Sequence, residues 1–133
     1  MKHRGTEDAE KSLSGITEVI IGAAIAVHRE LGPGLLESVY EDCLSLELKN
    51  TDLLVERQKA LPVVYKGNAT DSNFRLDFLI EDQVVVELKA VEKILPIHEV
   101  QVVTYLRLSR KKLGLLLNFN VPVMKSGIRR IIL

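Results

Sequence analysis

A short run of β-branched residues, VVVELKA at residues 84–90, is the feature that most constrains the fold of this chain. The three valines that open it are typical of a buried strand. Glu87 and Lys89 follow two residues apart, so both project from the same face of that strand. Burying a charge is costly unless the charge is paired or binds a metal. The strand therefore ends either at a wet edge of a sheet or at a chemical site.

Hydrophobic periodicity indicates two helices, then strands with one further helix among them. The first helix ends at Gly32-Pro33-Gly34, because glycine and proline interrupt helices. Residues 113–118 are apolar up to the closing Asn118, as expected for a central strand buried on both faces. We predict helices at residues 12–31 (capped by Ser12 or Ser14), 35–49 and 97–109 (opened by Pro96), strands at residues 60–66, 74–80, 83–90, 113–118 and 127–133, and turns at residues 67–71 and 81–82.

These elements predict one α/β domain at residues 12–133, in the order ααβββαββ, after a flexible polar arm at residues 1–11. The first three strands form an antiparallel meander, and the strand–helix–strand segment that follows predicts a parallel crossover. The result is a mixed β-sheet flanked by helices. Because 47% of residues are hydrophobic and only 5% aromatic, its core must be mainly aliphatic.

The sequence also indicates where in the cell the protein is located. The longest helical apolar run, residues 19–27, is too short to span a bilayer, and the polar N-terminus lacks the apolar region of a signal peptide. Cys43 is the only cysteine, so no internal disulfide can form. This fits a cytoplasmic protein, in which Cys43 is a small core residue.

The 18 basic and 18 acidic residues balance, but they are unevenly distributed. Residues 1–60 carry a net charge of −4 and residues 61–133 a net charge of +4. The basic surplus therefore forms either a local polyanion-binding patch or solvated helix ends. It comprises Arg107, Arg110, Lys111, Lys112, Lys125, Arg129 and Arg130.

Asp77 lies on the strand that precedes VVVELKA. Phe74, Leu76, Phe78 and Ile80 are predicted to share one face of that strand, which places Asp77 on the opposite face. A two-residue turn at residues 81–82 would put Asp77 opposite Val86, beside Glu87. Asp77, Glu87 and Lys89 would then meet at one place.

Two carboxylates and a lysine allow two interpretations. Hard oxygen ligands suit Mg²⁺, which would polarise a phosphoryl group and activate a water, while a lysine orients the water or stabilises developing charge. The alternative is a cross-strand ion pair at a sheet edge, which contributes little energy. Spacing alone favours the ion pair.

The order of the motifs adds a family resemblance. RLDF at residues 75–78 and ELK at residues 87–89 resemble the D…ExK core of the PD-(D/E)XK nuclease superfamily, in which a hairpin joins the two strands. GLLESVY at residues 34–40 resembles the signature of the small GxxExxY proteins, and a QxxxY pair follows in residues 101–105. The resemblance covers roughly residues 16–132 and implies a restriction-endonuclease-like fold.

The resemblance also assigns roles. It implies that Asp77, Glu87 and the backbone carbonyl of Leu88 bind Mg²⁺ or Mn²⁺, and that Lys89 is the catalytic lysine. Glu37 would join the metal or its water shell. Gln101 and Tyr105 lie on one face of the last helix and would hold the lysine, a metal-bound water or a phosphate.

Several of these residues also have purely structural interpretations. Glu37 also suits a helix N-terminus and His28 a helix C-terminus, because of the helix dipole. Tyr40 is more typical of the edge of a core than of a binding site. His98 either faces the same cleft as Gln101 or, more simply, is satisfied at the start of its helix.

The predicted function is thus a metal-dependent nuclease that hydrolyses phosphodiester bonds. The expected partner is nucleic acid, DNA in the first instance, although the motifs leave DNA and RNA open. A non-catalytic nucleic-acid-binding or assembly subunit on the same fold is the alternative, because a fold does not fix an activity. A small interaction module is a third interpretation. A chain of this size offers little surface for holding a duplex, and a homodimer or a protein partner would enlarge that surface.

Overall fold

Two helices open the structure, a computed structural model that describes residues 6–133, with side chains from residue 13 onward. Helix α1 (Thr6–Leu31) begins before the predicted Ser12 or Ser14, so the predicted flexible arm is helical from Thr6. The first five residues of that arm lie outside the described residues. Gly32 and Gly34 have φ of 70° and 99°, so glycine ends α1 as predicted, and α2 (Glu37–Lys49) follows.

The remaining elements form a five-stranded sheet and one further helix. Strand order follows chain order, β1-β2-β3-β4-β5, and β3 pairs in parallel with β4 while every other pair is antiparallel. This confirms the meander, the crossover and the order ααβββαββ. The elements are β1 (Val55–Tyr65), β2 (Asn68–Ile80), β3 (Val84–Lys89), α3 (Pro96–Ser109), β4 (Leu113–Asn118), the 3-10 helix η1 (Met124–Gly127) and β5 (Ile128–Ile132).

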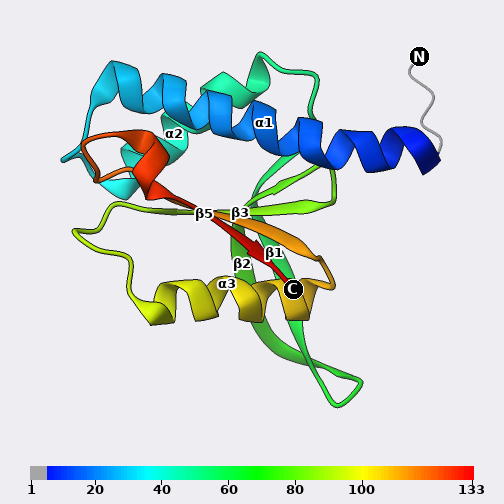
Figure 1. Cartoon of the computed structure of the whole chain (residues 1–133). Coiled ribbons are helices and arrows are strands. Elements are labelled where there is room, and N and C mark those ends of the chain that lie inside the picture. Colours follow the sequence, from blue (N-terminus) through cyan, green and yellow to red (C-terminus); the bar gives the residue numbers. More distant parts are fainter. Residues whose placement is uncertain (1–5) are drawn as a thin grey trace.

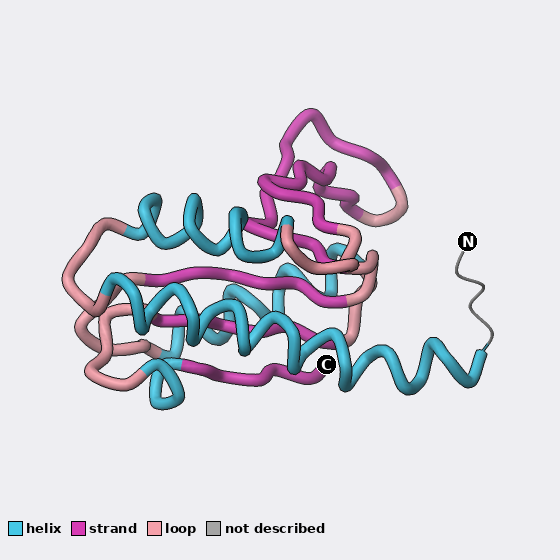
Figure 2. Tube along the Cα trace, turned by 90° about the horizontal axis from the view of Figure 1, so that it is seen from above, coloured by secondary structure: helices cyan, strands magenta, loops and turns pink. Residues whose placement is uncertain are grey.

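The helices cover both faces of the sheet, so the protein has three layers. Figure 1 shows α1 and α2 on one face and α3 on the other. Seen from above, α1 and α3 run roughly along the inner strands, and the β1–β2 hairpin projects from the body (Figure 2). All six residues of β4 are buried, as predicted for a central strand. None of the described helices is long and apolar enough to cross a membrane.

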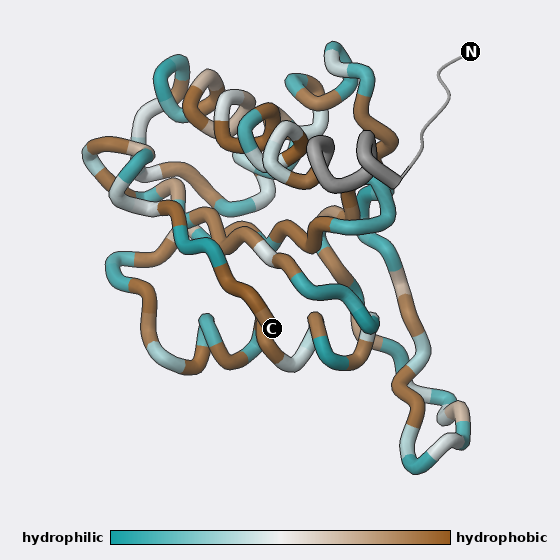
Figure 3. Tube along the Cα trace, turned by 45° about the vertical axis from the view of Figure 1, so that its right-hand side comes forward, coloured by the Kyte–Doolittle hydropathy of each residue, from teal (hydrophilic) through white to brown (hydrophobic). Residues whose placement is uncertain are grey.

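A buried cluster fills each of the two spaces between helices and sheet. The larger cluster joins α1 and α2 to the sheet and includes Ile20, Tyr40 and Leu115, with Cys43 partly buried against it. The smaller cluster joins α3 to the opposite face through residues such as Val102. Hydropathy follows this arrangement, because the central strands are largely hydrophobic and the hairpin turn is mainly hydrophilic (Figure 3).

The β1–β2 hairpin differs from its prediction. Only Lys66 and Gly67 form the turn, both with positive φ (50° and 80°), so the predicted turn at residues 67–71 is wrong. Two residues with positive φ suit the twist of a tight hairpin, which lets both strands continue to the turn. Strand β1 also begins earlier than predicted. Pro62 lies inside this edge strand, beside a register shift, where its missing N–H is tolerated.

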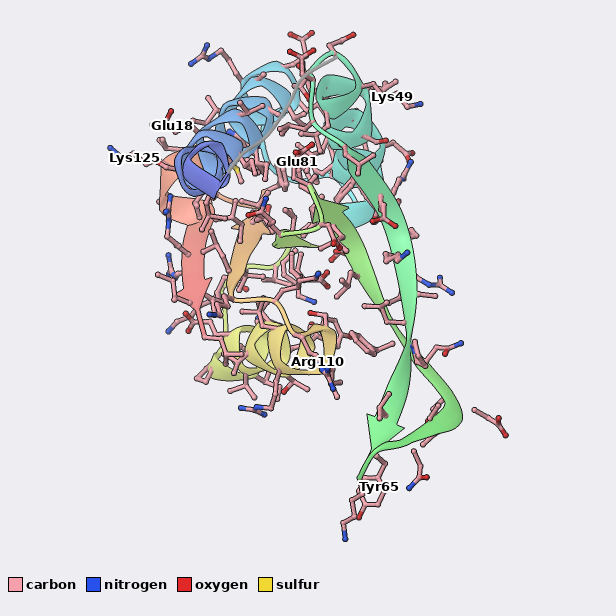
Figure 4. The ribbon with its side chains drawn as sticks, turned by 90° about the vertical axis from the view of Figure 1, so that its right-hand side faces the viewer. Glu18, Lys49, Tyr65, Glu81, Arg110 and Lys125 are labelled. Atoms are coloured by element: carbon pink, nitrogen blue, oxygen red, sulfur yellow. The ribbon has the colours of Figure 1, made fainter. Side chains whose placement is uncertain are left out.

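Strand β2 serves both cores, contrary to the prediction that its large side chains share one face. Phe74 and Leu76 pack in the cluster with α3, whereas Phe78 and Ile80 pack in the cluster with α1 and α2. The outer hairpin is a two-stranded ribbon, and such ribbons twist more strongly than wide sheets. Figure 4 shows this ribbon curving from the level of Glu81 to Tyr65 at its tip. The change of face falls at Asp77.

Candidate functional site

Asp77 and Glu87 lie opposite each other where β2 and β3 separate. The ladder between these strands comprises three pairs and ends at Phe78 and Val86. Beyond it, Asp77 N–H donates to Glu87 Oε2 (2.8 Å) and Leu88 N–H donates to Asp77 Oδ2 (2.9 Å). Two carboxylates therefore replace the backbone acceptors that a continuing ladder would provide.

The predicted pairing of Asp77 with Val86 is wrong by one residue. Ile80 pairs with Val84, so three residues connect the strands instead of the predicted two. Glu81 and Asp82 both have positive φ (53° and 54°). The extra residue shifts the register by one, so that Asp77 lies opposite Glu87 and not opposite Val86. The two carboxylates are therefore closer together than a two-residue turn would place them.

Burial makes both carboxylates difficult to ionise. Glu87 is only 4% exposed, and its burial, followed by the charge of Asp77, raises its pKa from 4.5 to about 8. Burial is also the main cause of the raised pKa of Asp77. The Lys89 charge lowers both pKa values, but less than burial raises them. The positive charge near this pair is therefore too small to keep both carboxylates ionised, and a bound cation would supply more.

Leu88 places a backbone carbonyl beside the carboxylates. Its N–H points to β2, where it meets Asp77, while the carbonyl of the next residue, Lys89, accepts from Phe119 N–H after β4. The N–H and C=O of one strand residue face the same neighbouring strand, and successive residues face opposite ones. The Leu88 carbonyl consequently faces the gap that holds the Asp77 carboxylate.

Lys89 joins a chain of polar side chains on α3. Lys89 Nζ donates to Gln101 Oε1 (3.2 Å), and Gln101 Nε2 donates to the Tyr105 hydroxyl (3.4 Å). The i, i+4 spacing places Gln101 and Tyr105 on one face of α3. Burial, then the charges of Glu87 and Asp77, raises the pKa of Tyr105, so the carboxylates influence this chain of side chains. A cleft of about 320 Å³ opens here, lined by Lys89, Ile97, His98, Val100, Gln101, Thr104 and Tyr105.

Glu37 reaches the same region from the other side. It is the first residue of α2, at an exposed position. Partial desolvation of its carboxylate by neighbouring atoms is the main cause of its raised pKa, and the charge of Asp77 is the next. The structure thus brings all seven residues implied by the resemblance to the end of β3, from α2, β2, β3 and α3.

Tyr40 and His98 have clear structural roles. Tyr40 is fully buried, stacks on Phe119 (4.7 Å between ring centroids) and donates from its hydroxyl to Gly32 O (2.6 Å). This places Tyr40 deeper in the core than the predicted core edge. His98 Nδ1 accepts from Leu95 N–H (2.9 Å), so His98 is satisfied at the start of α3 and also lines the cleft.

His28 was expected to complement the C-terminus of the first helix. It lies in the last turn of α1, where its Nε2 forms a 2.7 Å hydrogen bond with the carbonyl of Val121. The imidazole therefore ties α1 to the segment between β4 and η1.

Sequence reasoning missed three residues that support the site. Glu41 follows Glu37 by one helical turn, is 8% exposed and raises the pKa of Asp77 through its charge. That i, i+4 spacing was a usable signal. Gln58 hydrogen-bonds to Glu41, and its amide offsets part of the rise in the pKa of Asp77. Asn118 donates to Val91 O (2.9 Å) and accepts from Val91 N–H (3.0 Å), which fixes the chain just after Lys89.

The oxygen atoms at the end of β3 resemble the ligands that a divalent cation prefers. Among the described residues, no group of three or more Asp, Glu, His or Cys side chains is arranged to hold a metal ion. Mg²⁺, however, is commonly bound by only one or two carboxylates, with waters and phosphate oxygens completing its shell. Asp77, Glu87 and the Leu88 carbonyl are hard oxygen donors of this kind. The residues present therefore fit Mg²⁺ or Mn²⁺.

Comparison with known proteins defines the class of the protein. A family model described as the PD-(D/E)XK nuclease superfamily matches residues 14–131, which is most of the chain. The chain therefore belongs to the PD-(D/E)XK nuclease superfamily, and its fold is of the restriction-endonuclease-like type. No curated protein and no solved structure matches the chain.

Proposed function

We propose that this protein is a Mg²⁺- or Mn²⁺-dependent nuclease that hydrolyses phosphodiester bonds. The observation that carries the proposal is the meeting of Asp77 and Glu87 at the end of the β2–β3 ladder, with Lys89 next to them on β3. Membership of the superfamily supports nuclease activity. The finer assignment to the GxxExxY proteins, DNA as the substrate and a cytoplasmic location stay predictions.

The proposed mechanism divides the chemistry between the cation and the side chains. A bound cation would polarise the phosphodiester and lower the pKa of a water molecule. Asp77, Glu87 and the Leu88 carbonyl would hold it, with Glu37 in its water shell. Lys89, held by Gln101, would stabilise the negative charge that develops on the phosphate oxygens. The oxygen of water bonds to phosphorus as the water gives up one proton to solvent, the bond to the leaving sugar oxygen breaks, and that oxygen takes up one proton from solvent.

The alternative, a binding subunit that uses the late basic residues, has weaker support. Arg107 is in the last turn of α3 and Arg110 is its C-cap, as expected for solvated helix ends. Lys111 pairs with Asp82 (3.1 Å). Figure 4 shows Arg110 at α3 and Lys125 beside α1, on the other side of the sheet. The seven basic residues therefore do not all gather into one patch.

A cleavage assay tests the proposal directly. Labelled single-stranded, duplex and branched DNA, together with RNA, are incubated with Mg²⁺, Mn²⁺ or a chelator. Lys89→Ala is expected to lower the cleavage rate by roughly 10²–10⁴-fold, and Lys93→Ala, at an exposed position of the following loop, serves as the matched control. Metal-independent binding without cleavage of any substrate would favour the binding subunit instead.

A further inference from the structure

Gln58 has an unusual backbone conformation for a strand residue. Its φ is 53°, in the left-handed region that residues with a side chain seldom adopt. Lys66, Glu81, Asp82 and Arg110 share this property, but they lie in hairpin turns or at the C-cap of α3. Within the described part of the chain, Gln58 is thus the only non-glycine residue with positive φ inside a strand. Such a conformation persists only where its surroundings maintain it.

The register of the β1–β2 ladder places Gln58 beside the proposed site. Arg57 pairs with Phe78 and Lys59 pairs with Leu76, so Gln58 lies opposite Asp77. Strand β1 lies next to β2 on the side away from β3. Asp77 is therefore flanked by Gln58 on one side and by Glu87 and Leu88 on the other.

The side chain of Gln58 lies between two carboxylates. Its Nε2 donates to both carboxylate oxygens of Glu41, at 2.9 Å each, and its amide offsets part of the rise in the pKa of Asp77. Arg57 Nε donates to Glu41 Oε2 (2.8 Å), which fixes Glu41 from β1 as well. Glu41 and Asp77 repel each other, and an amide donor between them offsets part of that repulsion.

We propose that Gln58 is a positioning residue that fixes the orientation of the Asp77 carboxylate for a divalent cation. Asp77 then receives a donor from β3, the Leu88 N–H, and has the Gln58 amide opposite it on β1, where the Glu41 carboxylate holds that amide. The left-handed backbone is the conformation in which the Gln58 side chain reaches Glu41. Partners that orient a metal ligand in this way commonly contribute tenfold to a hundredfold to metal affinity. This inference rests on the proposed metal-dependent function.

Substitution by glycine separates positioning from folding. Gln58→Gly removes the amide and also relieves the left-handed backbone, because glycine adopts positive φ without a steric penalty. Mn²⁺ affinity, measured by titration calorimetry, is expected to fall by about tenfold or more. The unfolding temperature in chelator is expected to stay close to that of the wild type, because relief of the left-handed backbone offsets the loss of the hydrogen bonds to Glu41. Lys66→Gly is the matched control, because it relieves the same conformation in the hairpin turn and should leave Mn²⁺ affinity unchanged.

A second variant protects the test against misfolding. Gln58→Asn keeps a residue that tolerates positive φ, but its amide is one carbon shorter and should also weaken Mn²⁺ binding. If both variants bound Mn²⁺ as tightly as the wild type, or if both had a reduced unfolding temperature, the proposed role of Gln58 would be overturned. The proposed function of the protein would not be affected. A wild-type protein that binds no Mn²⁺ would instead overturn the proposed function, and the role of Gln58 with it.

Discussion

The backbone N–H of Asp77 donates to the Glu87 carboxylate over 2.8 Å, where the β2–β3 ladder ends. The Asp77 carboxylate in turn accepts from the N–H of Leu88, the residue after Glu87. Each carboxylate is thereby oriented by the opposite strand and retains further lone pairs for other donors or a cation. The arrangement concentrates negative charge in a buried place. The stability of the protein should therefore depend on this charge and on any cation that neutralises it.

Neutralising Glu87 should stabilise the metal-free protein. In Glu87→Gln, the side-chain carbonyl can still accept from Asp77 N–H, but the buried negative charge is gone. In chelator at about pH 9, the free energy of unfolding should rise by about 1 kcal/mol or more, since each unit of pKa shift corresponds to about 1.4 kcal/mol. Urea unfolding measures this change. Metal-dependent cleavage should be lost in the same variant.

Glu92→Gln is the matched control, because Glu92 is exposed in the loop after β3. Its free energy of unfolding should stay within about 0.5 kcal/mol of the wild type. A Glu87→Gln protein that is less stable than the wild type in chelator would contradict the view that Glu87 carries uncompensated charge.

Stability should also depend on pH in a predictable direction. Burial raises the pKa of Glu87 from 4.5 to about 8, so between these values the folded state keeps a proton that the unfolded state releases. The free energy of unfolding in chelator should therefore decrease as the pH rises from about 5 to about 8. Mn²⁺ would compensate the charge that appears, so it should stabilise the protein more at about pH 8 than at about pH 6.

Urea unfolding across this pH range, with chelator and with Mn²⁺, checks both statements. Glu87→Gln should show a shallower pH dependence, because the group responsible is absent. Equal stabilisation by Mn²⁺ at both pH values would show that the cation does not bind at these carboxylates.

Most of the fold could be predicted because the relevant signals are local. The largely apolar run at Leu113–Asn118 identifies a strand buried on both faces, and Pro96 marks the start of α3. Glycines end α1, and the crossover follows from the known handedness of such connections. Asp77, Glu87 and Lys89 were identified from the order of the motifs, which does not depend on an accurate register.

The details that could not be predicted depend on tertiary contacts. One extra residue in the β2–β3 turn changes which residues face each other, and the sequence Glu-Asp-Gln gives no clear indication of turn length. The left-handed conformation of Gln58 has no local signal, because glutamine rarely adopts it. The change of face along β2 arises from the twist of the projecting hairpin. Each of these features affects the surroundings of Asp77.

The tyrosine of the GLLESVY motif should matter for folding. The Tyr40 hydroxyl donates to Gly32 O (2.6 Å) and accepts from Leu35 N–H (3.1 Å), which holds the loop before Glu37 against the core. Tyr40→Phe leaves both backbone groups without this partner, so the free energy of unfolding should fall by about 1–3 kcal/mol. Urea unfolding measures it. Tyr65→Phe, at the exposed tip of the hairpin, should change it by less than about 0.5 kcal/mol.

The hydrogen-bonded chain from Lys89 through Gln101 to Tyr105 predicts a graded loss of activity. Lys89 acts directly, so Lys89→Ala should have the largest effect. Gln101→Ala leaves the lysine present but without its 3.2 Å partner, and kcat should fall by about tenfold. Tyr105→Phe removes only the hydroxyl at 3.4 Å from Gln101 and keeps the ring that contacts Phe74 (5.3 Å between centroids), so kcat should fall by only about twofold to threefold.

Steady-state cleavage kinetics on one substrate distinguish this order from a general effect on folding. The unfolding temperatures of Gln101→Ala and Tyr105→Phe should stay close to that of the wild type, because both residues are only partly buried. Thr104→Ser, on the same helix and lining the same cleft, is the control for a change that leaves the hydrogen-bonded chain intact. A larger loss in Tyr105→Phe than in Gln101→Ala would mean that the tyrosine acts on the substrate itself and not through Lys89.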